Sequence, residues 1–170
     1  MLSSSIECMQ TEQNQIHEFM VKAGQATPDR PGLPTNDVCE LRIKLIAEEL
    51  MELAEAFGYY LYMEDDSKGK GAPALRLAKQ SRLLPSLRDA YDAVEDIMVV
   101  TIGTGVAMGT DLQPGWDEVH ASNMSKFIDG YRRPDGKWMK GPSYQPARLQ
   151  PILDAQLGAA EQRDKQQALV

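Results

Sequence analysis

Carboxylates interrupt the apolar face of two long helical stretches, and this pattern constrains the fold of the chain most strongly. In the first stretch, residues 38–63, apolar side chains recur at helical spacing, at Ile46, Leu50, Leu53 and Phe57. On a helical wheel Glu49 and Glu52 fall in the apolar sector, so we expect both to point inward. Glu48 falls on the far side, yet it is near enough along the chain to reach the edge of a site formed there.

The second stretch begins near Pro85 and ends before Gly109, a residue type that favours a helix C-terminus. Asp92 and Asp96 lie four residues apart on one face, which continues as a stripe of small and apolar residues, so we expect these acids to be buried too. Residues 97–106 are apolar or small on nearly every side, which is typical of a helix inside a bundle or at a subunit interface.

The acids on both stretches predict a metal site. A buried carboxylate is costly unless it is paired or binds a metal. Acids one turn apart on two facing helices suit Mg²⁺ or Mn²⁺, which bind carboxylates together with water and substrate phosphates. With 25 acidic residues and only 2 histidines, the chain favours a hard cation held by oxygen. The competing interpretation is a solvated glutamate face; two acidic groups in two apolar stripes argue against it.

The rest of the chain predicts an all-α fold of four or five helices, with room for a small hairpin near residues 131–138. Asn36 or Asp37 should cap the first long helix. The polar, glycine-rich segment 64–84 is interpreted as a mobile loop insertion, with one helical turn near residues 75–80. The further helices expected are 7–22, 114–127 and 152–170. We expect one all-α domain over residues 1–150 and a polar helical tail over 151–170.

Composition excludes several classes of protein. The formal charge of −7 leaves no basic face for a phosphate backbone, so we expect no nucleic-acid partner. No apolar run approaches the ~18 residues of a membrane span, and the first residues do not resemble a signal peptide, so we expect a cytoplasmic protein without a membrane partner. Cys8 and Cys39 are isolated thiols, which excludes a disulfide framework and a zinc knuckle.

The acidic motifs resemble those of a known family. Residues 44–53, KLIAEELMEL, resemble the EExxE motif of the MazG-like all-α nucleoside triphosphate pyrophosphohydrolases. Residues 92–100 are similar to the second motif, ExxD, except that Ala93 stands where the glutamate is expected, so Asp92 or Glu95 must supply that carboxylate. The segment VHASNMSK at 119–126, followed by the stretch 135–144, resembles the branch found in phages and bacteria.

The resemblance implies metal-dependent hydrolysis of a nucleoside triphosphate to the monophosphate and pyrophosphate, with Mg²⁺ or Mn²⁺ as cofactor. The metal ligands that it implies are Glu49, Glu52, Asp92 and Asp96. Glu48 would bind a second ion or accept a proton from the attacking water. If the chain is encoded by a phage, its location would be the host cytoplasm. The family also implies a homodimer or homotetramer with sites near the subunit boundaries.

Further residues are candidates for substrate binding. Asn123 and Lys126 lie at i and i+3 on one helix, so both can address one ligand. Lys140 and Tyr144 lie in a loop bounded by glycine and proline that could close over phosphates, and Asn14 could contact the base. Some phage members act on dGTP, so the resemblance implies a purine deoxynucleoside triphosphate, with dGTP first.

Two alternatives stay open. Phosphoribosyl-ATP pyrophosphohydrolase has similar acidic motifs but lacks an obvious counterpart of the Asn123–Lys126 stretch. A non-catalytic helical assembly protein whose acids bind a structural cation would show a metal-dependent melting shift without turnover.

Overall fold

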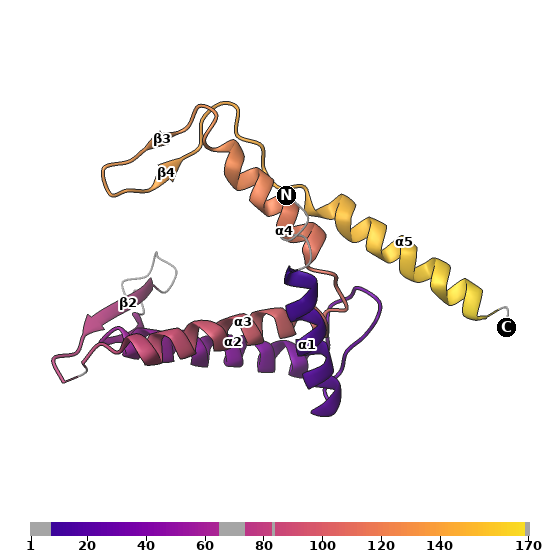
Figure 1. Cartoon of the computed structure of the whole chain (residues 1–170), viewed down its shortest axis with the longest axis horizontal. Coiled ribbons are helices and arrows are strands. Elements are labelled where there is room, and N and C mark those ends of the chain that lie inside the picture. The colour runs from indigo at the N-terminus through magenta and orange to yellow at the C-terminus, as the bar shows by residue number, and fades with distance from the viewer. Residues whose placement is uncertain (1–7, 65–73, 83, 169–170) are drawn as a thin grey trace. The chain divides into compact units, whose positions relative to one another are not determined.

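The structure, a computed structural model, describes residues 8–64, 74–82 and 84–168. Helices dominate the fold, as predicted, and make up 58% of it (Figure 1). The helices are α1 (Cys8–Lys22), α2 (Asn36–Ala56), α3 (Leu87–Ala107), α4 (Gln113–Ser125) and α5 (Leu149–Gln167). Two antiparallel pairs of strands accompany them, β1 (Tyr59–Glu64) with β2 (Ala74–Lys79) and β3 (Tyr131–Arg132) with β4 (Trp138–Met139).

The chain forms two compact units. One comprises residues 34–104, with α2, the β1–β2 pair and most of α3. The other comprises residues 1–33 and 105–170, with α1, α4, the β3–β4 pair and α5. In the part of the chain that the structure describes, no helix is long and apolar enough to cross a membrane.

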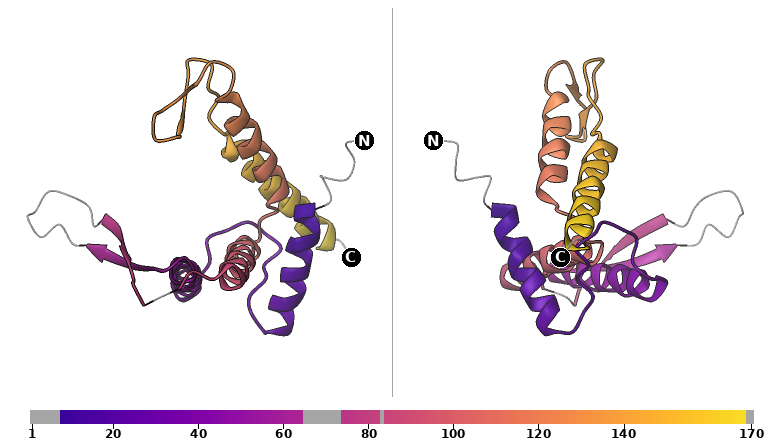
Figure 2. Two further views of the ribbon diagram at one scale, coloured as in Figure 1. Left: turned by 60° about the vertical axis from the view of Figure 1, so that its left-hand side comes forward. Right: turned by 90° about the vertical axis from the view of Figure 1, so that its right-hand side faces the viewer.

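In the unit 34–104, α2 and α3 run side by side (Figures 1 and 2). The backbone N–H of Ser86, just before α3, donates a 2.9 Å hydrogen bond to the carbonyl of Ala56 at the end of α2. Buried alanines line both helices at this end: Ala54 and Ala56 on α2, Ala90 and Ala93 on α3. The two helices that carry the predicted acids therefore belong to one compact unit.

The prediction that the first long helix reaches residue 63 is wrong. Helix α2 ends at Ala56, and Gly58 follows with φ = 81°, a left-handed conformation that favours glycine. The tyrosine-rich segment after it forms β1, which suits the preference of aromatic side chains for strands. Thr35, and neither Asn36 nor Asp37, is the N-cap of α2, and its side chain makes no capping hydrogen bond.

The interpretation of residues 64–84 also needs correction. Residues 74–79 form β2 instead of a helical turn, and Leu77 of β2 pairs with Leu61 of β1. Residues 65–73 lie outside the described part of the chain. The other predicted elements are observed with small shifts: α3 ends at Ala107, just before Gly109, and the C-terminal hairpin forms at β3–β4. Helix α5 begins three residues earlier than predicted, at Leu149.

Candidate functional site

Glu49 is the centre of the acidic site in the unit 34–104. Its side chain is half-buried on α2, and this burial is the largest cause of a pKa raised above the ordinary glutamate value. The negative charges of Glu52, Asp96, Glu48 and Asp92, in that order, raise the pKa of Glu49 further. The charges of four carboxylates therefore act on Glu49, two from α2 and two from α3.

The expectation that these acids point into a core is wrong within a single chain. Only Glu49 is half-buried, whereas Glu52, Asp92 and Asp96 are exposed. Apolar neighbours on the same helices are exposed as well, for example Leu50 (40%) and Met98 (42%). A helical wheel shows which residues share a face, but it does not show what covers that face. The acidic face is therefore accessible to a ligand.

The two candidates for the second motif have different surroundings. The phenol of Tyr91 hydrogen-bonds to Glu95, which is the largest cause of a raised pKa of Tyr91. Asp92, by contrast, is among the charges that raise the pKa of Glu49. This placement favours Asp92 over Glu95 as the carboxylate that accompanies Asp96.

The donor set fits a hard divalent cation. Among the described residues, no three carboxylate, imidazole or thiol side chains lie close enough together to hold a metal ion. Burial is the largest cause of the raised pKa of Glu49, and the charges that raise it further by repulsion nevertheless all belong to carboxylates. A divalent cation would remove this repulsion, and oxygen ligands are those that Mg²⁺ prefers. Glu49, Glu52, Asp92 and Asp96 are the residues that would hold it.

A pocket of about 460 Å³ opens beside this cluster. Two predicted ligands, Glu52 and Asp92, line it, together with Glu55, Ser86 and Asp89. At the start of α3, the backbone N–H of Asp89 donates a 3.3 Å hydrogen bond to the Ser86 hydroxyl. Neither Glu55 nor Asp89 is among the ligands predicted from the sequence. Their spacing of three residues from Glu52 and Asp92 is the signal that could have identified both.

A second group of candidates comes together in the other unit. The Lys126 ammonium donates a 2.7 Å hydrogen bond to the Asn123 side-chain carbonyl. The ammonium groups of Lys126 and Lys140 lie 5.9 and 4.1 Å from the centre of the Tyr144 ring. We call Asn123, Lys126, Lys140 and Tyr144 the lysine–tyrosine cluster. Asn14 is exposed on α1, and within the described residues no hydrogen bond links it to this cluster.

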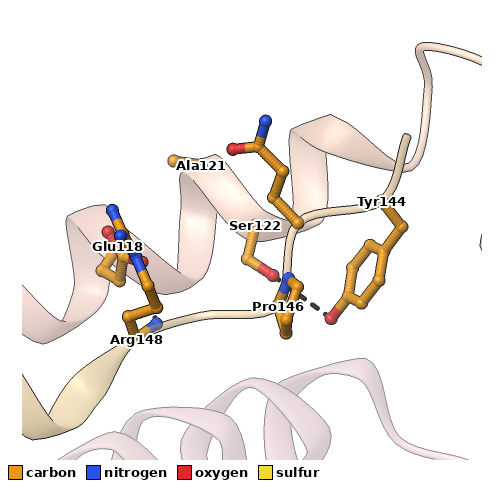
Figure 3. Close-up of a pocket in the computed structure, with 7 residues that line it drawn as sticks. Glu118, Ala121, Ser122, Tyr144, Pro146 and Arg148 are labelled. Carbon is orange, nitrogen blue, oxygen red and sulfur yellow. Dashed lines mark hydrogen bonds between the residues drawn. The ribbon is translucent and has the colours of Figure 1, made fainter. Parts of the chain in front are cut away.

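Ser122 orients Tyr144, and the sequence did not single it out. Its hydroxyl donates a 3.2 Å hydrogen bond to the Tyr144 phenol oxygen (Figure 3). This hydrogen bond is the largest cause that lowers the pKa of Tyr144, and the charges of Lys140 and Lys126 lower it further. A hydroxyl that donates to a phenol, with two ammonium groups nearby, is an environment that favours negative charge.

A pocket of about 380 Å³ adjoins Ser122 and Tyr144 (Figure 3). It lies between α4 and the segment that leads into α5, and its other lining residues are Glu118, Ala121, Gln145, Pro146 and Arg148. The backbone N–H of Arg148 donates a 2.8 Å hydrogen bond to the Glu118 carboxylate, which ties this segment to α4. Tyr144 of the lysine–tyrosine cluster therefore borders a cavity.

Comparison with known proteins identifies the family. The family described as phosphoribosyl-ATP pyrophosphohydrolase matches residues 16–123, well over half of the chain. The chain belongs to this family, which is part of the MazG-like all-α nucleoside triphosphate pyrophosphohydrolase superfamily. Its members are nucleotide pyrophosphohydrolases and typically require Mg²⁺. No curated protein matches the chain.

The extent of the match bears on the substrate. All five carboxylates lie inside the matched segment, whereas Lys126, Lys140 and Tyr144 lie beyond its end. The description of the family supports phosphoribosyl-ATP as the substrate better than dGTP. This finding reverses the order expected from the sequence, which placed dGTP first.

Proposed function

We propose that this protein hydrolyses the triphosphate chain of a purine nucleotide and releases pyrophosphate, with a divalent cation bound by Glu49, Glu52, Asp92 and Asp96. The observation that carries the proposal is the grouping of four carboxylates around Glu49, all within the segment that matches a pyrophosphohydrolase family. Mg²⁺ is the first candidate for the cation and Mn²⁺ the second.

The roles of the residues follow from their charges. A triphosphate brings several negative charges to a site that already carries five carboxylates, so it binds only if cations offset the repulsion. The cation, once bound, stabilises the charge that develops on the phosphate oxygens. Glu48 lies at the edge of the group and accepts a proton from the water that attacks phosphorus. The bond from that phosphorus to the bridging oxygen breaks, and pyrophosphate leaves.

The first candidate substrate is phosphoribosyl-ATP, on the strength of the family description. The second is a purine deoxynucleoside triphosphate, with dGTP first. Lys126, Lys140 and Tyr144 of the lysine–tyrosine cluster favour this second candidate, because they lie beyond the matched segment and belong to the stretches that resemble the third motif of the phage and bacterial branch. Both candidates contain a purine and a triphosphate, so one acidic site would serve either.

We assign the lysine–tyrosine cluster to the phosphates. Lys126 and Lys140 supply positive charge close to the Tyr144 ring, and Asn123 supplies an amide next to Lys126. Asn14 on the exposed side of α1 is the proposed contact to the base.

The protein is proposed to assemble as a homodimer or homotetramer. Large apolar side chains on α2 and α3 are exposed in the single chain, among them Ile43 (68%), Tyr91 (67%) and Val94 (42%). Helices with so much exposed apolar surface normally pack against another element. A second copy that covers them would bury the acidic face more deeply and raise the affinity for a cation.

A substrate panel with Mg²⁺ tests the proposal. Purified protein is incubated with phosphoribosyl-ATP, dGTP, dATP, dCTP and dUTP, and pyrophosphate is measured separately from single phosphate. We expect pyrophosphate from phosphoribosyl-ATP at a kcat/KM about tenfold above that for any deoxynucleotide. If dGTP is cleaved faster, the second candidate replaces the first. If dCTP or dUTP is cleaved tenfold faster than both, the purine assignment is wrong.

A further inference from the structure

Asp129 anchors the segment that carries two members of the lysine–tyrosine cluster. Its carboxylate accepts three hydrogen bonds from Ser143: two from the backbone N–H, at 3.2 and 3.1 Å, and one from the hydroxyl, at 2.7 Å. Asp129 follows the end of α4, whereas Ser143 lies in the segment between β4 and α5. The contact therefore joins two parts of the chain that are 14 residues apart.

Close packing reinforces this anchor. Gly141 lies against Asp129, and a Cβ atom at Gly141 would overlap both the carboxylate and the backbone of Asp129. The backbone N–H of Tyr144 donates a 3.1 Å hydrogen bond to the Gly141 carbonyl, which closes a turn over residues 141–144. The turn is thus fixed against Asp129 at two of its four residues, Gly141 and Ser143.

The fixed turn places the functional side chains. Lys140 immediately precedes it and Tyr144 is its last residue, so its geometry sets the 4.1 Å distance between the Lys140 ammonium and the Tyr144 ring. A second anchor follows, because the backbone N–H of Gln145 donates a 2.9 Å hydrogen bond to the buried Ser125 hydroxyl. Asp129 makes no hydrogen bond to Lys140 or Tyr144 and acts on them only through the turn.

We propose that Asp129 is a positioning residue for the lysine–tyrosine cluster and that, through Ser143, it holds Lys140 and Tyr144 ready for the triphosphate chain of the substrate. The inference rests on the proposed function, because it takes the cluster to be the phosphate-binding part of the site. Side chains held in the binding geometry before the ligand arrives lose less conformational freedom on binding. Loss of the anchor should therefore weaken phosphate binding without affecting the carboxylates of the other unit.

The test compares four variants for binding of inorganic triphosphate in the presence of Mg²⁺. Asp129→Ala removes the acceptor, Ser143→Ala removes the hydroxyl donor, and Ser143→Thr keeps it. Asp135→Ala is the matched control, because this carboxylate also accepts a backbone hydrogen bond, from Lys137 at 3.2 Å, but in the β3–β4 turn. We expect Kd to rise about tenfold for Asp129→Ala, less for Ser143→Ala, and to stay within about twofold for Ser143→Thr and Asp135→Ala.

Ultraviolet titration of the Tyr144 phenol, as the difference from Tyr144→Phe, gives a second readout. Ser122 and the two lysines lower the pKa of this phenol, so release of the turn should raise it again in Asp129→Ala but leave it unchanged in Asp135→Ala. A purely structural role for Asp129 would lower the melting temperature without this change. An unchanged titration curve in Asp129→Ala contradicts the inference.

Lys126→Ala distinguishes a failure of the proposed phosphate-binding role of the cluster from a failure of the positioning role of Asp129. If wild-type protein binds triphosphate and Lys126→Ala does not weaken binding, the role of the cluster in the proposed function is wrong and the inference is wrong with it. If Lys126→Ala weakens binding but Asp129→Ala and Ser143→Ala bind like wild type, the positioning role alone is wrong. Weakened binding in all three, with both controls near wild type, supports the inference.

Discussion

Glu49 on α2 and Asp96 on α3 are coupled across two helices: the pKa of Glu49 is raised first by burial and then by neighbouring charges, of which Asp96 is one. The coupling is unfavourable to the folded chain as long as no cation is bound, because like charges repel. A divalent cation bound at this site would offset the repulsion and so stabilise the folded chain.

Neutral isosteric variants of the acids should abolish turnover. Glu49→Gln and Asp96→Asn each remove one negative charge while keeping the shape of the side chain. We expect kcat/KM for pyrophosphate release to fall at least about a hundredfold in each, with helical circular dichroism unchanged. Glu40→Gln is the matched control, because Glu40 lies on α2 and forms an ion pair with Lys44 instead. Turnover near the wild-type rate in Glu49→Gln would exclude Glu49 as a metal ligand.

The stability of the metal-free protein should depend on the protonation of Glu49. Its pKa in the folded chain is raised above the ordinary value of 4.5, so folding favours the protonated form. The contribution of Glu49 to stability is therefore fully present below pH 4.5 and is lost as the pH rises through its raised folded-state pKa.

Thermal melts in chelator across this pH range check the sign of the effect. The melting temperature of Glu49→Gln should exceed that of wild type by more as the pH rises. The reason is that Glu49 ionises in wild type and is then repelled by its neighbours, whereas glutamine stays neutral. Added Mg²⁺ should reverse the trend in wild type and have little effect on the variant. A difference that is the same at every pH would contradict the raised pKa.

Gly58 should resist substitution. Its φ of 81° lies in the left-handed region, and it ends the segment between α2 and β1. We expect Gly58→Ala to lower the free energy of unfolding by about 1–2 kcal/mol. The control is Gly158→Ala within α5, where a Cβ atom meets no other atom within 4 Å, and where alanine should stabilise the helix by about 0.5–1 kcal/mol. Denaturant unfolding measures the free energy of unfolding of both variants. Equal changes in the two would contradict a special requirement for glycine at position 58.

Assembly is predicted from exposed apolar surface on α2 and α3. Light scattering at several dilutions should give the mass of at least a dimer. Val94 on α3 is 42% exposed, and Val94→Lys should lower the measured mass by placing charge on this surface. The helical content of the variant should remain that of wild type if the chain folds alone. A monomer mass for wild type at every concentration would contradict the prediction.

The sequence was sufficient to predict those elements whose signals are local. The ends of α3 and the pairing of acids on α2 and α3 follow from spacing within each helix, as does the placement of Asn123 and Lys126 on one face. The β1–β2 hairpin was missed because the apolar spacing up to Phe57 continues a helical pattern, and a strand is stabilised by its partner rather than by its own sequence.

The residues that support the candidate site were harder to predict, for a related reason. Ser122, Asp129 and Ser143 act through contacts between segments 14 or more residues apart, and small polar residues of this kind give no distinctive sequence signal. The exposure of Glu52 was also mispredicted, because periodicity assigns a side to each residue but does not say which side is covered.

Pyrophosphate release by wild type and by Glu49→Gln, each with Mg²⁺ and with excess chelator, tests the central claim most directly. With phosphoribosyl-ATP or dGTP as substrate, we predict that wild type with Mg²⁺ forms one pyrophosphate and one nucleoside monophosphate per substrate consumed. Chelator should stop the reaction, and Glu49→Gln should be inactive under both conditions. Full activity of wild type in chelator, or Mg²⁺-dependent stabilisation of wild type without turnover of any triphosphate, would contradict the account.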